Sequence, residues 1–332
     1  MEEHVMQNKR IYTIGPKHSI VEDCPMPELG DTKVLIRNTY VGVCMSEHYD
    51  WAHVSKPTGF GHEPIGVIEA VGKNVKNFKA GDKVCGLWGN PLPGGGGMVK
   101  YTTADVNTAT LMHIPEGIRE IDLLVEPLSC LISAVSKAKC NVPGMDVCVV
   151  GAGYMGCGAI SLLKLRGCFV TAVDIRPESR ENAKKYGADT VLSVEEAEAM
   201  LKDGFKGFDV VMEWGETDDS LDLALRLTKM CGQLCLGAYH TGPSRTVNMQ
   251  MMNVKAIDCL STHPRERDLN IIAAKNAVRL LESGMWDFKD IPTKVYPMNK
   301  YDLAQAELET KFGTHMKAVI DMSALDGEPY VI

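Results

Sequence analysis

Residues 147–174 read VCVVGAGYMGCGAISLLKLRGCFVTAVD, and this segment predicts the architecture of a large part of the chain. A short apolar run leads into a glycine turn, an apolar segment of helical character follows to about Leu165, and a second apolar run ends at Asp174. Gly151, Gly153 and Gly156 have the G-x-G-x-x-G spacing. Strand, turn, helix and strand in this order are typical of a unit that binds a dinucleotide.

Each part of the turn has a physical role in such a unit. Gly151 permits the sharp turn, Gly153 lets a pyrophosphate approach the backbone, and Gly156 lets the helix pack closely on the strand. The free N–H groups at the start of the helix attract the phosphates. We expect the cofactor to be held by residues of the turn and of the second strand end: Gly151, Gly153, Tyr154, Met155, Gly156, Asp174, Ile175 and Arg176.

The acid at the end of the second strand predicts the choice of cofactor. Asp174 follows Gly156 by 18 residues, where a carboxylate accepts hydrogen bonds from the ribose hydroxyls of adenosine. A carboxylate there repels a 2′-phosphate, so NAD is favoured over NADP. Arg176 and Arg180 lie close in sequence and soften that preference.

Composition and length exclude several classes of protein. The 332 residues are 45% hydrophobic and 23% charged, which suits two globular domains. A net charge of −8 without a long basic run argues against nucleic acid or an anionic membrane as a partner. We see no signal peptide and no apolar run long enough for a membrane span, and we expect a cytoplasmic protein. The 11 cysteines are scattered, and those in apolar runs are expected in the core: Cys148, Cys168, Cys235 and Cys259.

The pattern of elements changes along the chain. Residues 1 to about 40 alternate apolar and polar residues between proline and glycine breaks, which predicts short strands and not helices. The extended pattern continues, with residues 89–97 as a loop, so we expect the first third to form a β-rich, partly barrel-like domain. Strands and helices then alternate to about residue 265, which predicts a parallel, doubly wound sheet. The fold class is therefore α/β, with residues 1–126 and 266–332 in one domain and residues 127–265 in a Rossmann domain.

A second group of residues is able to bind a metal. Cys44 lies in GVCMSEH, and His62 and Glu63 lie in GHEPIG; Glu126 lies in VEPL, at the domain junction. Thiolate, imidazole and carboxylate are ligands of zinc in tetrahedral sites. On spacing alone, however, one cysteine and one histidine 18 residues apart are better explained as an unrelated pair.

Over essentially its whole length, the sequence resembles the zinc-dependent medium-chain dehydrogenases, and within them the sorbitol and threonine dehydrogenase branch. The motifs that carry the resemblance are Gly42-Val-Cys44-x-Ser46-Glu47, Gly61-His62-Glu63-x-x-Gly66, Val67-x-x-x-Val71-Gly72-x-x-Val75, Gly81-Asp82-x-Val84, Glu126-Pro127-Leu128 and the glycine turn, in this order.

The resemblance implies a GroES-like catalytic domain, a homo-oligomer (a dimer or a tetramer), and a reaction. A secondary alcohol of a polyol, a sugar derivative or a similar small molecule would pass a hydride to NAD, with one catalytic zinc ion polarising the alcohol. The resemblance also implies zinc ligands: Cys44 and His62, Glu63 either as a direct ligand or as one that exchanges with water, and Glu126 directly or through water. It further implies that Ser46 hydrogen-bonds the substrate hydroxyl and that Glu47 orients His62.

Two departures from the family pattern affect these expectations. The family often carries a histidine five residues after the cysteine, at the outer end of a proton relay, whereas here Tyr49 occupies that place beside His48. Many members also carry four close cysteines that bind a structural zinc. The corresponding stretch, residues 88–100, has no cysteine, so we expect no structural zinc.

Some alternatives stay open at this point. A metal-free quinone or enoyl reductase shares the expected fold, but the resemblance implies that it would lack Cys44, His62 and Glu63. A non-catalytic NAD-binding protein is the other alternative. His240, which ends a strand on the cofactor side, is equally a nicotinamide neighbour and a solvated loop residue.

Overall fold

The computed structural model describes residues 7–89, 95–310 and 314–332. The chain forms two compact units: a first unit of Met1–Glu126 with Asp290–Ile332, and a second unit of Pro127–Lys289. From the sequence, we expected the later boundary after residue 265. In the structure, residues 266–289 stay with the second unit, because helix α8 (Arg267–Glu282) buries five apolar residues there and Trp286 Nε1 donates to Ser161 Oγ at 2.8 Å.

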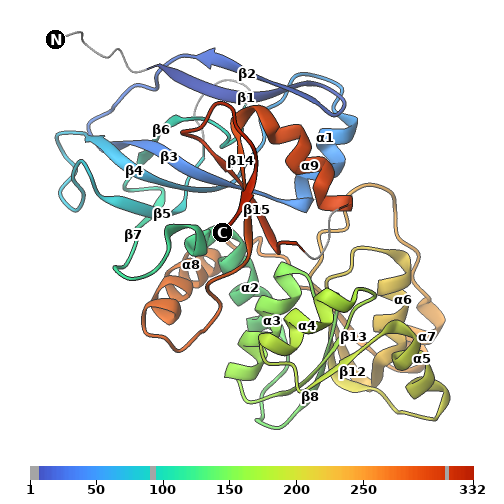
Figure 1. Ribbon diagram of the computed structural model, residues 1–332. Helices are drawn as coiled ribbons and strands as arrows, with labels where there is room; N and C mark the ends of the chain where they lie inside the picture. Colours follow the sequence, from blue (N-terminus) through green and yellow to red (C-terminus); the bar gives the residue numbers. More distant parts are fainter. Residues whose placement is uncertain (1–6, 90–94, 311–313) are drawn as a thin grey trace, which may run out of the picture. The chain divides into compact units, whose positions relative to one another are not determined.

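A six-stranded sheet forms the centre of the second unit, in the order β10-β9-β8-β11-β12-β13 with every neighbouring pair parallel (Figure 1). The expected doubly wound parallel sheet is thereby confirmed. Its strands are β8 (Asp146–Val150), β9 (Phe169–Val173), β10 (Thr190–Leu192), β11 (Phe208–Glu213), β12 (Thr228–Leu236) and β13 (Asp258–Ser261). The helices are α2 (Val125–Lys137), α3 (Tyr154–Leu165), α4 (Pro177–Lys185), α5 (Val194–Lys202), α6 (Asp218–Leu227), α7 (Met249–Val254) and α8.

The glycine turn joins β8 to α3 as the spacing predicts. Gly151 has a φ of +91°, and a Cβ there would lie 2.8 Å from the backbone nitrogen of Gly215. A Cβ on Gly156 would lie 1.9 Å from the carbonyl oxygen of Gly151. Both positions therefore need glycine, one for its backbone conformation and the other for the close approach of helix and turn.

The first unit is built on an eight-stranded sheet in the order β16-β14-β15-β3-β4-β5-β7, with β6 paired to β3, and on a two-stranded ribbon of β1 and β2. Its strands are β1 (Asn8–Gly15), β2 (His18–Cys24), β3 (Lys33–Val43), β4 (Glu63–Val71), β5 (Lys83–Leu87), β6 (Tyr101–Asp105), β7 (Thr110–His113), β14 (Thr293–Pro297), β15 (Lys317–Asp321) and β16 (Tyr330–Val331). Its helices are η1 (Met45–Glu47), α1 (His48–His53), η2 (Glu120–Leu123), η3 (Met298–Lys300) and α9 (Tyr301–Thr310).

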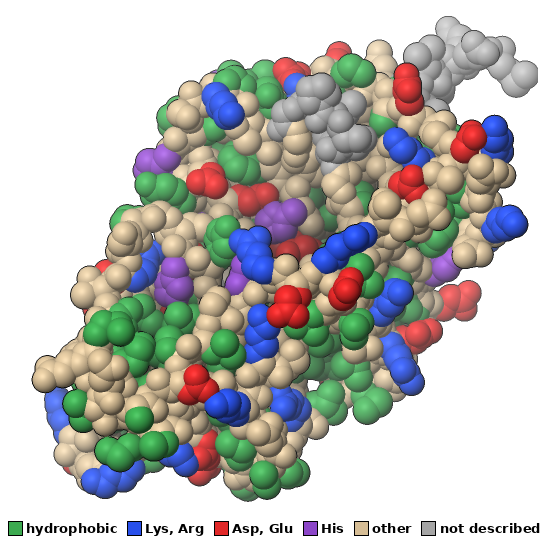
Figure 2. Space-filling view, turned by 180° about the vertical axis from the view of Figure 1, so that it is seen from behind, with side chains coloured by type: hydrophobic (Ala, Val, Ile, Leu, Met, Phe, Trp, Pro, Cys, Tyr) green, Lys and Arg blue, Asp and Glu red, His purple; other side chains and the backbone are tan. Residues whose placement is uncertain are grey.

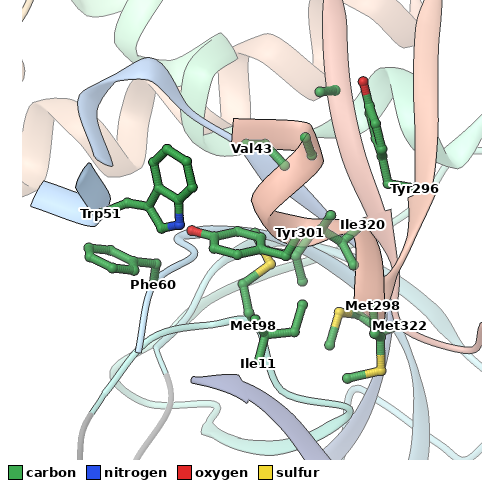
Figure 3. Packing of buried hydrophobic residues seen from close by; sticks show 13 residues of the cluster. Ile11, Val43, Trp51, Phe60, Met98, Tyr296, Met298, Tyr301, Ile320 and Met322 are labelled. Carbon is green, nitrogen blue, oxygen red and sulfur yellow. The ribbon is translucent and has the colours of Figure 1, made fainter. Parts of the chain in front are cut away.

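An aromatic core holds the early and late parts of the first unit together. Figure 3 shows the ring of Tyr301 on α9 pointing toward Trp51 on α1, with Phe60 and Met98 beside them. Trp51 Nε1 donates to the carboxylate of Asp302 at 2.8 Å, so the buried indole keeps its hydrogen bond. The chain from Asp290 on thus belongs to the first unit, whereas we expected its return from residue 266.

Some local expectations differ from the structure. The β-rich first third also contains two short helices, η1 and α1, which we did not predict. We expected a helix over residues 218–230, but α6 ends at Leu227, because Thr228 already pairs with Phe208 in the sheet. Cys259 is exposed, since β13 is an edge strand, whereas Cys148, Cys168 and Cys235 are buried as expected. Of the loop expected at 89–97, residues 90–94 lie outside the described residues.

The surface carries charges of both signs. On the face in Figure 2, basic and acidic side chains are scattered among apolar and polar ones. Among the helices described, none combines the length and apolar character that a membrane crossing needs.

Candidate functional site

Two neighbouring strands bring the predicted metal ligands together. β3 ends at Val43, directly before Cys44, and β4 begins at Glu63, directly after His62. The two strands pair antiparallel with Gly42 opposite Glu63. The end of one strand therefore lies beside the start of the other, and residues 18 positions apart in sequence become neighbours.

The ligand atoms of Cys44, His62 and Glu63 all lie within 4.8 Å of one another. Glu126, in the first turn of α2, places its Oε2 atom 3.8 Å from Nε2 of His62. All four residues belong to the first unit. Sulfur, imidazole nitrogen and carboxylate oxygen at this separation match the donor set of a zinc site, so the residues present fit the metal that the sequence predicts.

The imidazole of His62 is oriented by a carboxylate. Glu47 Oε1 lies 2.8 Å from Nδ1 of His62 and also accepts a hydrogen bond from the Gly61 backbone N–H at 2.8 Å. Nδ1 is thus occupied, and Nε2 remains for a metal, an arrangement typical of ligating histidines. Ser46 Oγ donates to the sulfur of Cys44 at 3.2 Å. The expected closeness of Ser46 and Glu47 to the ligands is present in this geometry.

The pKa of His62 reflects this environment. Burial alone would lower it, but the hydrogen bonds with Cys44 and Glu47 outweigh burial and raise the pKa of His62 to about 12. Without a metal, the imidazole therefore keeps a proton beside the cysteine sulfur and the Glu47 carboxylate. Binding of a metal ion at these ligands must release that proton.

Glu63 has a partner that our sequence analysis did not include. Lys317, the first residue of β15, places Nζ 2.6 Å from Oε2 and 2.8 Å from Oε1 of Glu63, and the side chains are 8% and 0% exposed. Lys317 Nζ also donates to the Val43 carbonyl at 3.2 Å. Burial alone would lower the pKa of Lys317, but the negative charges of Glu63 and Cys44 outweigh it and raise the pKa. The lysine therefore stays charged and holds Glu63 at the edge of the ligand group.

The residues after Ser46 do not follow the family pattern of a relay, and the structure shows where they lie. His48 is buried, and its Nε2 lies 2.9 Å from a carboxylate oxygen of Glu309. Tyr49 is 37% exposed and stacks on His53 with ring centroids 4.2 Å apart.

The predicted cofactor residues gather at the carboxyl ends of β8 and β9. Asp174 directly follows β9 and is buried, and its Oδ2 accepts the Ala152 N–H of the glycine turn at 2.7 Å. Arg176 reaches back to the same carboxylate, with Nε 3.1 Å from Oδ1. The Asp174 carboxylate thus holds the glycine turn in place. Arg176, one of the two arginines that we expected to soften its charge, forms an ion pair with it.

The other predicted residues of this site have different surroundings. Gly153 precedes α3, and a Cβ there would meet only Arg176 Nη2, at 3.9 Å, so the backbone is open to a ligand. Among the described residues, no side chain caps the helix at Gly153, which leaves N–H groups of the first turn for phosphate. Tyr154 packs on Phe288 with ring centroids 5.3 Å apart, Met155 is partly buried, and Ile175 is 75% exposed.

Comparison with known proteins agrees with both halves of this description. The model of the alcohol dehydrogenase GroES-like domain matches residues 30–116, and that of the zinc-binding dehydrogenase matches residues 155–270. Sorbitol dehydrogenase of Bacillus subtilis (strain 168) is 26% identical, with 90% of this chain and 93% of the relative covered. Sorbitol dehydrogenase of Homo sapiens is 26% identical, with 97% and 98% covered.

Solved structures show the same fold. L-idonate 5-dehydrogenase from Escherichia coli superposes with a TM-score of 0.81 at 19% identity, covering 95% of this chain and 98% of the other. The fold and the ligand group together define a zinc- and nicotinamide-dependent oxidoreductase. The chain belongs to the family of zinc-dependent medium-chain dehydrogenases, which confirms the resemblance and the GroES-like plus Rossmann fold class.

Proposed function

We propose that the protein oxidises a secondary alcohol of a polyol, a sugar derivative or a similar small hydroxylated molecule with NAD, and catalyses the reverse reduction. The observation that carries the proposal is the group formed by Cys44, His62 and Glu63, with ligand atoms within 4.8 Å of one another and Glu126 next to His62. The polyol class is supported by the similarity to sorbitol dehydrogenases over nearly the whole chain.

In this proposal, Cys44, His62 and Glu126 hold the zinc ion, and Glu63 is a ligand that competes with its bond to Lys317. When bound, zinc acts as a Lewis acid that lowers the pKa of an alcohol hydroxyl toward neutrality. Glu47 fixes the ring of His62 through Nδ1. Ser46, whose Oγ lies 3.2 Å from the Cys44 sulfur, would accept a hydrogen bond from the substrate hydroxyl and would take that proton only as it passes its own outward to solvent.

The cofactor in this proposal is NAD, held by the residues around the glycine turn. Asp174 accepts the adenosine ribose hydroxyls in place of the Arg176 guanidinium, which occupies its carboxylate in the structure, and the start of α3 binds the pyrophosphate. We further propose a cytoplasmic homo-oligomer, a dimer or a tetramer. All 11 cysteines are free thiols, which suits a reducing compartment, and β13 offers an exposed sheet edge for subunit contact.

Metal analysis combined with an activity screen tests the proposal. The purified protein should contain one zinc ion per chain and should form NADH when offered NAD and members of a panel of polyols, sugar acids, inositols and amino alcohols. Exhaustive chelation, or the substitution Cys44→Ser, should abolish the activity, and added zinc should restore only the chelated wild type. Full activity in zinc-free protein would refute the metal-dependent mechanism and would favour the metal-free quinone or enoyl reductase.

A control variant separates loss of zinc from loss of fold. Cys259→Ser changes an exposed cysteine on the edge strand β13 and should leave the zinc content unchanged. Binding of NAD without turnover of any compound in the panel, despite bound zinc, would instead support a non-catalytic nucleotide-binding protein.

A further inference from the structure

A buried pair of side chains lies beside the glycine turn, at the carboxyl ends of β11 and β12. Glu213, the last residue of β11, is fully buried, and its Oε2 lies 2.9 Å from Nε2 of His240. Its other oxygen accepts the backbone N–H groups of Gly215 and Glu216 and the hydroxyl of Ser220. Both oxygens of the Glu213 carboxylate therefore have hydrogen-bond partners, and they hold His240 and the loop after β11 in place.

The hydrogen bond to Glu213 determines which nitrogen of His240 is free. Because an ionised carboxylate accepts only, Nε2 must donate to it. The remaining nitrogen, Nδ1, is buried and has no hydrogen-bond partner among the described residues. A buried polar atom without a partner costs free energy, so a group that fills this place from outside the protein would gain affinity.

The conformation of the loop supports a role in binding. His240 has a φ of +53° and Glu216 a φ of +62°, so each of the two neighbouring loops holds a non-glycine residue in the left-handed region. The loops are joined, because Glu216 Oε1 accepts the Thr241 N–H at 3.0 Å and Arg245 Nη2 donates to the Glu216 carbonyl at 3.0 Å. The position of the imidazole is thus set from both sides.

A second buried nitrogen on this edge also lacks a partner. Nε1 of Trp214, directly after β11, has no hydrogen-bond partner among the described residues. Its indole covers Gly237 after β12, where a Cβ would lie 2.6 Å from the ring. Both unpartnered nitrogens, on Trp214 and His240, thus belong to the segments that follow β11 and β12.

The order of the strands indicates which ligand reaches this edge. Asp174, after β9, lies on one side of β8, and β11 and β12 lie on the other. A dinucleotide extends across the sheet at this point, with its pyrophosphate at the glycine turn between its two halves. If adenosine binds at Asp174, the other nucleoside lies over β11 and β12.

We propose that His240, held by Glu213, binds the nicotinamide nucleoside half of the dinucleotide through Nδ1. This inference rests on the proposed NAD site and adds a residue to it. The hydrogen bond to Glu213 raises the pKa of His240 and so favours the imidazolium form, in which Nδ1 donates to an oxygen of the ligand, either a ribose hydroxyl or the carboxamide. The charged groups that act on this imidazole are Glu213, Glu216 and Arg245.

Two substitutions separate the two ring nitrogens. In His240→Gln the amide takes the place of Nε2 and can still bond Glu213, but Nδ1 is lost. In His240→Asn the amide takes the place of Nδ1, asparagine tolerates a positive φ, and the bond to Glu213 is lost. The first variant tests the ligand contact, and the second tests the support of the loop.

Calorimetric titration of the full-length protein with ADP, ADP-ribose and NADH reads out the contact. His240→Gln should bind ADP like the wild type and NADH about tenfold more weakly, the effect of one lost charge-assisted hydrogen bond. If His240→Gln binds both ADP-ribose and NADH more weakly than the wild type, the contact is to the ribose. If it binds only NADH more weakly, the contact is to the carboxamide. Both results support the proposal. His240→Asn should retain more of the NADH affinity than His240→Gln.

Other outcomes would overturn the inference. If His240→Gln binds NADH as tightly as the wild type, Nδ1 makes no contact with the ligand. If the variant loses ADP and NADH affinity equally, the histidine acts only on the fold. A wild type that binds neither ADP nor NADH would refute the proposed cofactor site itself, and this result differs from both of the others.

Discussion

The buried ion pair of Lys317 and Glu63 allows a quantitative test of how the ligand group is held in place. Substituting Lys317 with Met keeps most of the volume and apolar stem of the side chain but removes its charge. The Glu63 carboxylate, which is 0% exposed, then loses the ammonium group that lies 2.6 Å from its Oε2 atom. A buried carboxylate without a counter-charge is costly, so the variant should be strongly destabilised.

The magnitude follows from the geometry. At 2.6 Å and an effective dielectric constant of about 20, the attraction between the two charges is about 6 kcal/mol. Much of this offsets the cost of taking both ions out of water, and removing one partner of such a pair typically costs about 3–5 kcal/mol. We therefore expect Lys317→Met to lower the free energy of unfolding of the first unit by about 3–5 kcal/mol.

The measurement is urea unfolding at pH 7.5 in the presence of a chelator, so that bound metal does not contribute to stability. Hydrogen exchange of the amides of β3 and β15 localises the effect to the first unit. Lys73→Met is the matched control, because Lys73 pairs with Asp31 at 2.9 Å while both side chains are more than half exposed. Such an exposed pair contributes about 0–1 kcal/mol.

A double variant separates charge from packing. Glu63→Leu combined with Lys317→Met removes both charges and should be more stable than Lys317→Met alone by about 2 kcal/mol or more. The reasoning is refuted if Lys317→Met costs no more than the Lys73 control. It is also refuted if the second substitution recovers nothing, because the loss would then come from packing.

Two further predictions concern the second unit. Arg176→Ala should raise the ratio of kcat/KM for NAD to that for NADP about tenfold, because it removes the cation 3.1 Å from the Asp174 carboxylate. Arg180→Ala is the control and should change this ratio little, because the Arg180 guanidinium donates to backbone carbonyls. An equal shift of the ratio in both variants would contradict this assignment. The stability of the fold should also depend on the charge of His240, because Glu213 raises the pKa of this histidine. The pair stabilises the fold fully below the ordinary histidine pKa of about 6.5. This contribution is lost as the pH rises through the higher pKa of the folded state. The difference in unfolding free energy between the wild type and His240→Gln should therefore be larger at pH 6 than at pH 9, and a difference that grows with pH would show that the imidazolium does not stabilise the pair.

The parts of the fold that were predictable from sequence depend on local signals. The glycine spacing at 151–156 needs only a sharp turn and a close helix, and both are properties of neighbouring residues. The alternation of strands and helices that follows produced the expected parallel sheet for the same reason. The six-residue helix α1 was not predicted, because so short a helix is stabilised by tertiary contacts such as those of Trp51.

The candidate metal site was predictable to a smaller extent. Spacing alone did not distinguish Cys44 and His62 from an unrelated pair, and the resemblance to a family was needed. The structure explains why spacing is a weak signal here: the antiparallel pairing of β3 and β4 brings the residues together, and a long connection between the strands is tolerated. The boundary after residue 265 differs for a related reason, since the packing of α8 and of Trp286 on Ser161 has no local signal.

The residues that sequence reasoning missed share one physical property. Lys317 and Glu63 are 254 positions apart, and Glu213 and His240 are 27 apart, yet each pair buries a charge against an opposite one. A buried charge is tolerated only with a partner, so a lysine or glutamate inside an apolar strand is itself a signal that a partner exists. Lys317 begins the run KAVID and Glu213 ends the run FDVVME, so this signal was present in both strands. What the sequence does not contain is the identity of the partner, because that depends on which strands become neighbours in the sheet.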